Sequence, residues 1–208
     1  MLGFTLSKVN MLIFVTAIFA IVTFFTVTLC QVTTVNELNL ILDRLTRRGY
    51  ALANSPAYCD STFYHFPAEI SSCGQRFFYS VNISVQQATD AGGDPINYLI
   101  FSAFNRRDTQ QDNALVADSL RTNADITLFN FQPLSVAGNE GIAIDPQARI
   151  PVNGVALVKE IVGGQTQVYV VPCNSEANQC EVRKEEAGCL IKTGDTSCAG
   201  GTRTGFNC

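Results

Sequence analysis

The cysteine thiols of this sequence could form disulfide bonds or bind a metal. The chain has 208 residues, with eight cysteines and a single histidine. No two cysteines are spaced as a CxxC pair, so the usual zinc signatures are missing. Five of the eight fall in the last 36 residues, a segment rich in glycine and poor in large apolar side chains. Disulfides commonly hold such segments together, and they persist in oxidising compartments outside the cytoplasm. The sequence therefore predicts disulfide bonds in an exported domain.

The pairing of these cysteines is predicted from their closeness in the sequence. Three bonds would each close a short loop, namely Cys59–Cys73, Cys173–Cys180 and Cys189–Cys198. Cys30 and Cys208 are then left over. Eight cysteines allow about 105 connectivities, and reduced, buried cysteines in a cytosolic domain are the alternative. Asn82 begins a single Asn-Ile-Ser acceptor motif for N-glycosylation, which agrees with an exported domain.

Catalytic and metal-binding chemistry has little support in this sequence. His65 is the only histidine, so a histidine-based metal site or a Ser-His-Asp triad would depend on it alone. The GxSxG, HExxH and phosphate-binding glycine motifs are missing. Five aspartates between residues 90 and 118 lack the spacing of a calcium-binding loop. We therefore expect no enzymatic activity, no cofactor and no bound metal.

The charge balance argues against nucleic-acid binding. The formal net charge is −4 and the sequence pI is about 4.9, so no overall positive field would attract phosphate groups. We expect no nucleic-acid partner.

A long apolar segment near the N-terminus must be shielded from water. Residues 11–29 contain 19 positions without a charge, which as a helix would be about 28 Å long, close to the thickness of a bilayer's hydrocarbon core. A cleaved signal peptide has a shorter apolar region of about 7 to 15 residues. A chain of this size cannot easily enclose a helix that is apolar on all sides. The segment therefore predicts a membrane span or the packing surface of an assembly.

The following residues predict that the same helix continues with one apolar stripe. Apolar side chains recur at steps of three and four, at Val32, Val35, Leu38, Ile41, Leu42 and Leu45. No proline or glycine interrupts residues 4–48, so we expect one helix of about 65 Å. Arg44, Arg47 and Arg48 would interact with its C-terminal end, and Gly49 would close it.

The rest of the chain changes to the pattern of strands. Segments rich in Val, Ile, Phe and Tyr lie at residues 75–86, 96–104, 124–131 and 154–171. Gly163-Gly164 and residues 90–95 are typical of hairpin connections. The sequence thus predicts an α+β protein with a transmembrane or assembly helix at 1–49. An extracellular, mainly antiparallel β domain with a cysteine-rich tail follows at 50–208.

The orientation in a membrane is predicted from two signals that disagree. Lys8 precedes the apolar segment, whereas Arg44, Arg47 and Arg48 follow it, which by the positive-inside rule favours a cytoplasmic C-terminal side. These arginines lie 15 or more residues beyond Leu29, at the limit of the rule. The cysteines therefore weigh more, and we expect the β domain outside the cell.

The start of the chain resembles a type IV pilin. The residues Gly3-Phe4-Thr5-Leu6 are followed by the apolar helix and a C-terminal β domain. The resemblance is close over residues 3–29 and covers the rest in outline. Lys8 stands where bacterial pilins have a glutamate, so the chain is more similar to an archaeal-type pilin. The resemblance implies that a peptidase cuts between Gly3 and Phe4, and that the released helices leave the membrane to form the core of a filament.

Side chains of the apolar segment suit contacts between copies. Small residues let helices approach closely, and phenylalanines could fill gaps between neighbours; the candidates are Phe14, Ala17, Phe19, Ala20, Phe24 and Phe25. The predicted function is a structural subunit of a cell-surface filament, a helical homopolymer of this chain that is held in the membrane before assembly. The alternatives are a single-pass surface protein for adhesion or envelope organisation, and a minor pseudopilin of a secretion machine.

Overall fold

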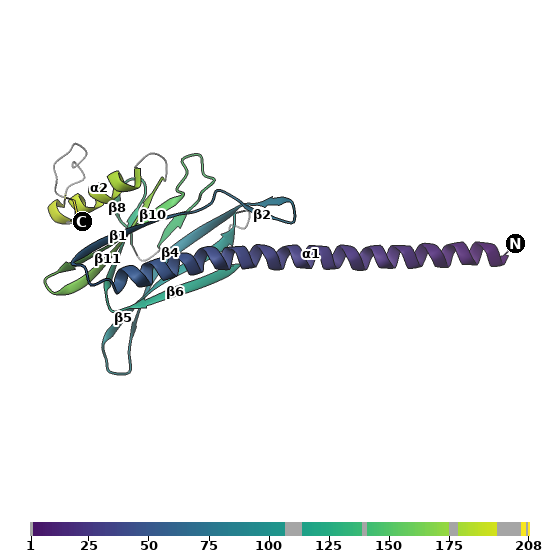
Figure 1. Ribbon diagram of the computed structural model, residues 1–208, viewed down its shortest axis with the longest axis horizontal. Coiled ribbons are helices and arrows are strands. Elements are labelled where there is room, and N and C mark those ends of the chain that lie inside the picture. Colours follow the sequence, from purple (N-terminus) through teal and green to yellow (C-terminus); the bar gives the residue numbers. More distant parts are fainter. Residues whose placement is uncertain (1, 107–113, 139–140, 175–178, 195–204, 207) are drawn as a thin grey trace.

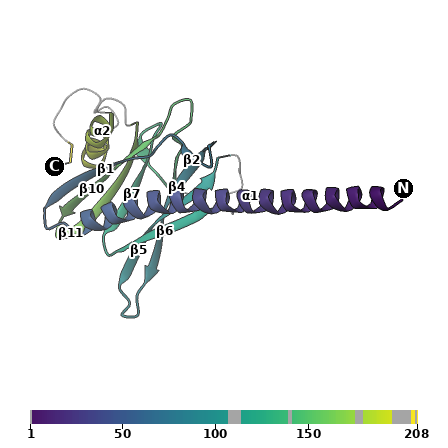
Figure 2. The same cartoon turned by 45° about the vertical axis from the view of Figure 1, so that its right-hand side comes forward.

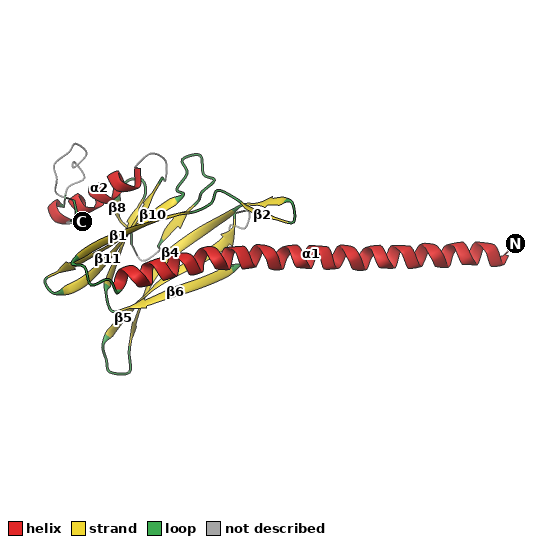
Figure 3. Cartoon of the chain, viewed as in Figure 1, coloured by secondary structure: helices red, strands yellow, loops and turns green. Residues whose placement is uncertain are grey.

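The computed structural model describes residues 2–106, 114–138, 141–174, 179–194, 205–206 and 208, with side chains from residue 8 onward. Helix α1 (Leu2–Ala53) is one uninterrupted rod. Its first half projects away from a domain in which the strands gather around its second half (Figure 1, Figure 3). The predicted α+β class is confirmed, with a long N-terminal helix followed by mainly antiparallel strands.

Helix α1 ends later than the sequence analysis predicted. An end at residue 48 with a cap at Gly49 is wrong, because Gly49 lies inside the helix and is buried. A Cβ atom at Gly49 would lie 3.1 Å from Cδ2 of Leu120 in strand β6 (Val116–Thr122). The glycine therefore allows the helix to approach the sheet closely. The helix stops before Ser55-Pro56, where the residue preceding proline is disfavoured in helical conformation.

A buried lysine stands at the C-terminal end of α1. Lys159 of strand β10 (Gly154–Val162) is 4% exposed, and its Nζ donates a hydrogen bond to the carbonyl oxygen of Ser55. A cation is favourable where the last carbonyl groups of a helix carry partial negative charge. Capping by the arginines of segment 44–48 is therefore wrong, because they lie more than one turn before Ala53 and the last turn contains no basic residue.

Replacing Lys159 with methionine is expected to lower the free energy of unfolding by roughly 2–3 kcal/mol, because the part-buried carbonyl of Ser55 loses a charge-assisted hydrogen bond. Arg47→Met is the matched control, since Arg47 makes an exposed ion pair with Asp43 and such helical pairs contribute only about 0.3–0.5 kcal/mol. Urea unfolding of the full chain in detergent, followed by tyrosine fluorescence, measures both. A larger loss for Arg47→Met would show that the arginine, not the lysine, stabilises the helix.

The strands form two sheets and a separate hairpin. The five-stranded sheet has the order β1 (Cys59–His65), β10, β11 (Gln165–Cys173), β7 (Asp125–Asn130) and β8 (Ser135–Val136), with one parallel pair, β11–β7. The four-stranded sheet is antiparallel, with the order β6, β5 (Pro95–Asn105), β4 (Tyr79–Thr89) and β9 (Ile142–Ile144). Strands β2 (Ile70–Ser72) and β3 (Gln75–Phe77) form the hairpin.

The predicted strand segments correspond to β3 and β4, β5, β7, and the β10–β11 hairpin. Both predicted turns are present. Gly163 and Gly164 connect β10 to β11 with φ angles of 61° and 83°, in the left-handed region that glycine adopts without strain. Asp90 closes the β4–β5 turn, because its Oδ1 accepts hydrogen bonds from the N–H groups of Gly92 at 2.8 Å and Asp94 at 2.9 Å.

Strands β1, β2, β6, β8 and β9 and the second helix, α2 (Gln179–Thr193), lie outside the predicted segments. Helix α2 lies in the cysteine-rich tail, and its buried residues include Ala187 and Gly188. Small side chains of this kind leave no apolar stripe in the sequence, so the helical period is hidden.

Helix α1 and both sheets share one core. Leu38, Leu42 and Leu45 of α1 are fully buried. They belong to one cluster with fully or almost fully buried side chains of both sheets: Val81, Ile83, Leu99, Phe101, Val155, Leu157 and Val170. The amphipathic half of the helix is thus a structural part of the β domain.

The other face of the five-stranded sheet is covered by α2 and the C-terminal Phe206 (Figure 1, Figure 2). This second layer contains Ala156 and Val158 of β10, which alternate with residues that face α1. Strand β10 is therefore covered on both faces. That burial explains its continuous run of apolar residues, because a strand with one exposed face would alternate apolar and polar residues.

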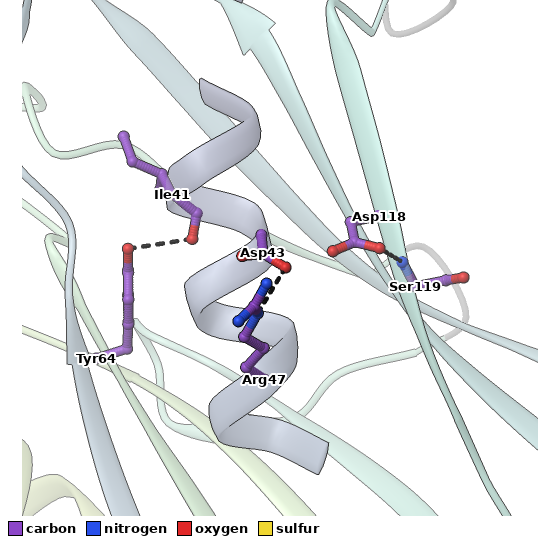
Figure 4. Close-up of polar contacts among 6 residues, drawn as sticks. All are labelled: Ile41, Asp43, Arg47, Tyr64, Asp118 and Ser119. Carbon is purple, nitrogen blue, oxygen red and sulfur yellow. Dashed lines mark hydrogen bonds and ion pairs between the residues drawn. The ribbon is translucent and has the colours of Figure 1, made fainter. Parts of the chain in front are cut away.

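Helix α1 passes between β1 and β6, each the outermost strand of its sheet (Figure 4). The Tyr64 hydroxyl of β1 donates a hydrogen bond to the carbonyl oxygen of Ile41 at 3.1 Å. Aspartates in both strands accept the N–H of the next residue at 2.8 Å, Asp118 from Ser119 and Asp60 from Ser61. A donor occupied in this way cannot pair with a strand of another chain, so one position of each edge is blocked.

Buried tyrosines make the fold sensitive to alkaline pH. Tyr79 is fully buried and its hydroxyl donates to the Pro67 carbonyl oxygen at 2.8 Å. Burial and, to a smaller extent, the neighbouring Tyr64 raise the pKa of Tyr79 well above its ordinary value. Burial also raises the pKa of Tyr64 and of Tyr169.

The free energy of unfolding is expected to be constant up to about pH 10 and to fall above it, because these tyrosines ionise at about pH 10 only when unfolded. Tyr79 alone adds a slope of about −1.4 kcal/mol per pH unit in this window. Tyr79→Phe should remove this part of the slope, although it costs about 1 kcal/mol at neutral pH through the lost hydrogen bond. Urea unfolding between pH 8 and 12 tests this, and an unchanged slope in the variant would contradict it.

Candidate functional site: the exposed stem of helix α1

The stem, which comprises residues 8–29 of α1, is exposed along its whole length. Its large apolar side chains range from 46% exposed at Ile18 to 74% at Phe19. The helix is long and apolar enough to cross a membrane, with a mean hydropathy of 2.5 over a window that has no buried residue. Soluble monomers rarely expose continuous apolar surfaces of this size. Lipid or other protein chains must therefore cover the stem.

The residues predicted to contact other copies all lie on this stem. Phe14, Phe19, Phe24 and Phe25 are 60–74% exposed, and Ala17 and Ala20 are exposed as well. Successive residues turn by about 100° around the helix, so these side chains point in several directions. The stem offers an interface all round, as a helix inside a bundle or a bilayer does.

The threonines of the stem satisfy their own hydroxyl groups. Thr16, Thr23, Thr26 and Thr28 each donate to the carbonyl oxygen four residues earlier, at 2.8–3.0 Å. A hydroxyl bonded within its own helix needs neither water nor a partner chain, which suits an apolar environment. These threonines therefore do not prevent the stem from entering lipid.

A disulfide marks the point where the stem meets the β domain. Cys30 is half-buried and is bonded to Cys73 in the β2–β3 turn, with Cα atoms 5.6 Å apart. The hydroxyl of Ser72 donates to the Cys30 carbonyl oxygen at 3.0 Å. The predicted Cys59–Cys73 pair is therefore wrong. The fold brings the hairpin to the helix, and this proximity cannot be read from the separation of 43 residues.

The remaining cysteines correct one prediction and agree with another. Cys59, at the start of β1, is bonded to Cys208, so the view that Cys30 and Cys208 are left over is wrong. Cys173 and Cys180 are bonded, which is the expected short loop. Cys189 is buried in α2, while its predicted partner Cys198 lies outside the described residues.

The other candidate residues lie outside the stem. His65 is exposed at the end of β1, and no group of three His, Cys, Asp or Glu side chains that could hold a metal occurs among the described residues. Asn82 lies in β4 between the buried Val81 and Ile83, so its half-buried side chain faces away from α1. Its glycosylation stays a prediction. Gly3 and Phe4 lie in the first turns of α1, and cleavage between them also stays a prediction.

The apolar helix and the disulfides together indicate a membrane-anchored or secreted protein. Cys30, the first residue beyond the stem, is itself oxidised, which agrees with an oxidising environment for the β domain. The arginines of segment 44–48 lie in the half of α1 that packs against the β domain. Arg48, for example, donates to the Phe63 carbonyl oxygen and lies over the Tyr64 ring, 5.4 Å from its centroid.

The chain matches no family model, no curated protein and no solved structure. Its architecture is pilin-like. A long apolar N-terminal helix leads into an antiparallel β domain that packs around the second half of the same helix and is closed by disulfides. This pilin-like arrangement describes the plan of the chain, which a membrane-anchored surface protein could share.

Proposed function

We propose that this chain is a structural subunit of a surface filament of the type IV pilus kind. In this filament the stems of many copies form the core and the β domains face the medium. The observation that carries the proposal is the exposure of the stem on all sides. A helix without a polar face needs neighbours in every direction, and a bundle of identical stems supplies them.

The stem would lie in the membrane before assembly. Its 22 residues make a helix of about 33 Å, close to the thickness of the hydrocarbon core. Lys8 would then stand at the cytoplasmic interface, and cleavage between Gly3 and Phe4 would precede release. In lipid and in a bundle of stems alike, the backbone hydrogen bonds of the stem are satisfied within the helix itself. The role is structural and needs neither catalysis nor a cofactor.

The second candidate is a single-pass surface protein that stays in the membrane, for adhesion or envelope organisation. The match between stem length and bilayer thickness fits a permanently anchored protein as well as it fits the membrane-bound precursor of a filament subunit. The two proposals differ in where the mature chain is found.

Electron microscopy of material sheared from the cell surface, with mass spectrometry of the N-terminus, separates the two candidates. Filaments that contain this chain, with Phe4 as the first residue, are expected for the pilin-like subunit. Retention of the whole chain in the membrane fraction, with no filaments under several growth conditions, would reject the filament and favour the anchored protein.

A further inference from the structure

A two-stranded arm projects from the domain. The arm comprises residues 84–97, the outer ends of β4 and β5 with their turn. Strands β4 and β5 pair with each other up to Thr89 and Pro95, but β9 pairs with β4 only at Val81–Ile83. Strand β6 pairs with β5 only from Asn97 onward. The arm therefore leaves the sheet, and both views show it pointing away from α1 (Figure 1, Figure 2).

Hydrogen bonds hold the arm at its base and at its tip. At the base, the Asn97 side chain donates to the Ala124 carbonyl oxygen at 2.9 Å, and Ile96 is buried. At the tip, Asp90 holds the turn through its bonds to Gly92 and Asp94, and Gly93 has a φ of 91°. Such an arm is shaped before it meets a partner, which lowers the entropy lost on binding.

The middle of the arm has no support from the rest of the described chain. Gln86, Gln87, Ala88 and Thr89 are all exposed, and so are residues 91–95. A two-stranded ribbon is only marginally stable alone in water. No described side chain accepts a strand N–H of the arm, whereas Asp60 and Asp118 each accept one N–H of β1 and β6. The arm thus has the features of a contact element.

A cleft of about 1290 Å³ lies on the other side of α1. Its walls come from α1, β1, the segment that follows β1, and the start of α2; they include Ile41, Arg44, Arg48, Tyr64, His65 and Val182. The arm and α2 lie on opposite sides of the α1 axis in both views (Figure 1, Figure 2). When two copies stand side by side with parallel stems, the arm of one therefore faces the cleft of the next.

The two surfaces offer one matched pair of opposite charges, Asp94 on the arm and Arg44 in the cleft. Asp90 and Asp94 are the only charged residues of the arm. The α1 wall of the cleft offers Arg44, whose guanidinium makes no ion pair with any described residue, and Arg48 beside it. The cleft also has four carboxylates. Of these, Glu69 and Glu181 are paired with Arg76 and Lys184, at 3.4 Å and 2.6 Å, while Glu37 belongs to α1 and Glu185 to α2.

We propose that the arm of one copy docks in the cleft of a neighbouring copy, with Asp94 facing Arg44. This inference rests on the proposed filament. The two contact surfaces differ and lie on opposite sides of the molecule, so the interface is head-to-tail. Interfaces of this kind continue from copy to copy and generate open helical polymers, whereas a self-complementary patch would close as a dimer.

Photo-crosslinking in whole cells tests the contact. The full chain carries p-benzoylphenylalanine in place of Ala91 at the tip of the arm. Irradiation is expected to give dimers in which this residue is linked to residues 37–48, 63–71 or 180–185 of a second copy. The same crosslinker at Ala143, exposed on β9, is the control and should not link to these segments. Absence of dimers, or links from the arm to other surfaces only, would overturn the proposal.

Charge exchange gives a second measurement. Asp94→Arg and Arg44→Asp are each expected to lower filament yield about tenfold by placing like charges together, and the double variant should restore it to within about twofold. Equal melting temperatures would exclude misfolding. Failure of the double variant to recover would reject the pairing. If wild-type filaments form but give no crosslink, the arm–cleft contact is rejected and the proposed filament stands. If crosslinked dimers are found only in membranes, the proposed filament is rejected and the contact stands.

Discussion

Replacing Phe19 with glutamate is expected to remove nearly all of the chain from both membranes and filaments. Phe19 lies at the middle of the stem and is 74% exposed. A charged side chain at the centre of a membrane helix costs about 3 kcal/mol on insertion scales, which is roughly a hundredfold in the equilibrium. In a bundle of stems the carboxylate would likewise be buried without a partner.

The experiment compares membrane and sheared fractions by quantitative immunoblotting. Phe19→Leu keeps an apolar side chain and should leave both fractions within about twofold. Val162→Glu adds the same charge at a position on the β domain that is 51% exposed, so it should have little effect. If Phe19→Glu kept wild-type amounts in the membrane and in filaments, the stem could not be the segment that is shielded from water.

Removal of the Cys59–Cys208 disulfide is expected to cost more stability than removal of any shorter loop. The bond joins residues 149 apart and ties the C-terminus to the start of β1. In the chain-entropy account, a loop of this length restricts the unfolded chain by about 5 kcal/mol, whereas the loop between Cys173 and Cys180 gives about 2.5 kcal/mol. The tested variant has alanine at both Cys59 and Cys208, so that no free thiol remains from this pair.

Loss of this bond should also loosen the layer on the second face of the five-stranded sheet. Phe206, two residues before Cys208, is buried against Tyr169, with ring centroids 4.7 Å apart. Chemical unfolding of the double variant, compared with Cys173→Ala plus Cys180→Ala, measures the difference. The long-loop explanation would be wrong if the Cys173 variant lost as much stability as the Cys59 variant.

Much of the helix could be predicted from the sequence, because its determinants are local. Apolar side chains on all sides over residues 11–29, followed by one apolar stripe, require a rod whose two halves meet different surroundings. The structure confirms this division, with an exposed stem and with Leu38, Leu42 and Leu45 fully buried. The hairpin turns were predictable for the same reason, since glycine and aspartate fix a turn within a few residues.

Features that depend on distant neighbours could not be predicted. Gly49 looked like a helix cap because glycine often ends helices, but its lack of a side chain serves a close contact with Leu120, 71 residues later. The helix end is capped by Lys159, which no local pattern could place there. Helix α2 could not be predicted because small residues face the sheet, so its buried face has no period of large apolar residues in the sequence.

The sequence by itself determined that this chain has a long helix with an apolar half and a strand-rich domain. It also determined that the chain has enough cysteines for several disulfides, which suit an oxidising environment. Composition and short-range periodicity control these properties. Only the tertiary structure decided which cysteines meet, which cation closes the helix, and that an arm and a cleft lie on opposite sides of it. Those outcomes depend on contacts between residues tens of positions apart, and the packing of the two sheets around α1 creates them.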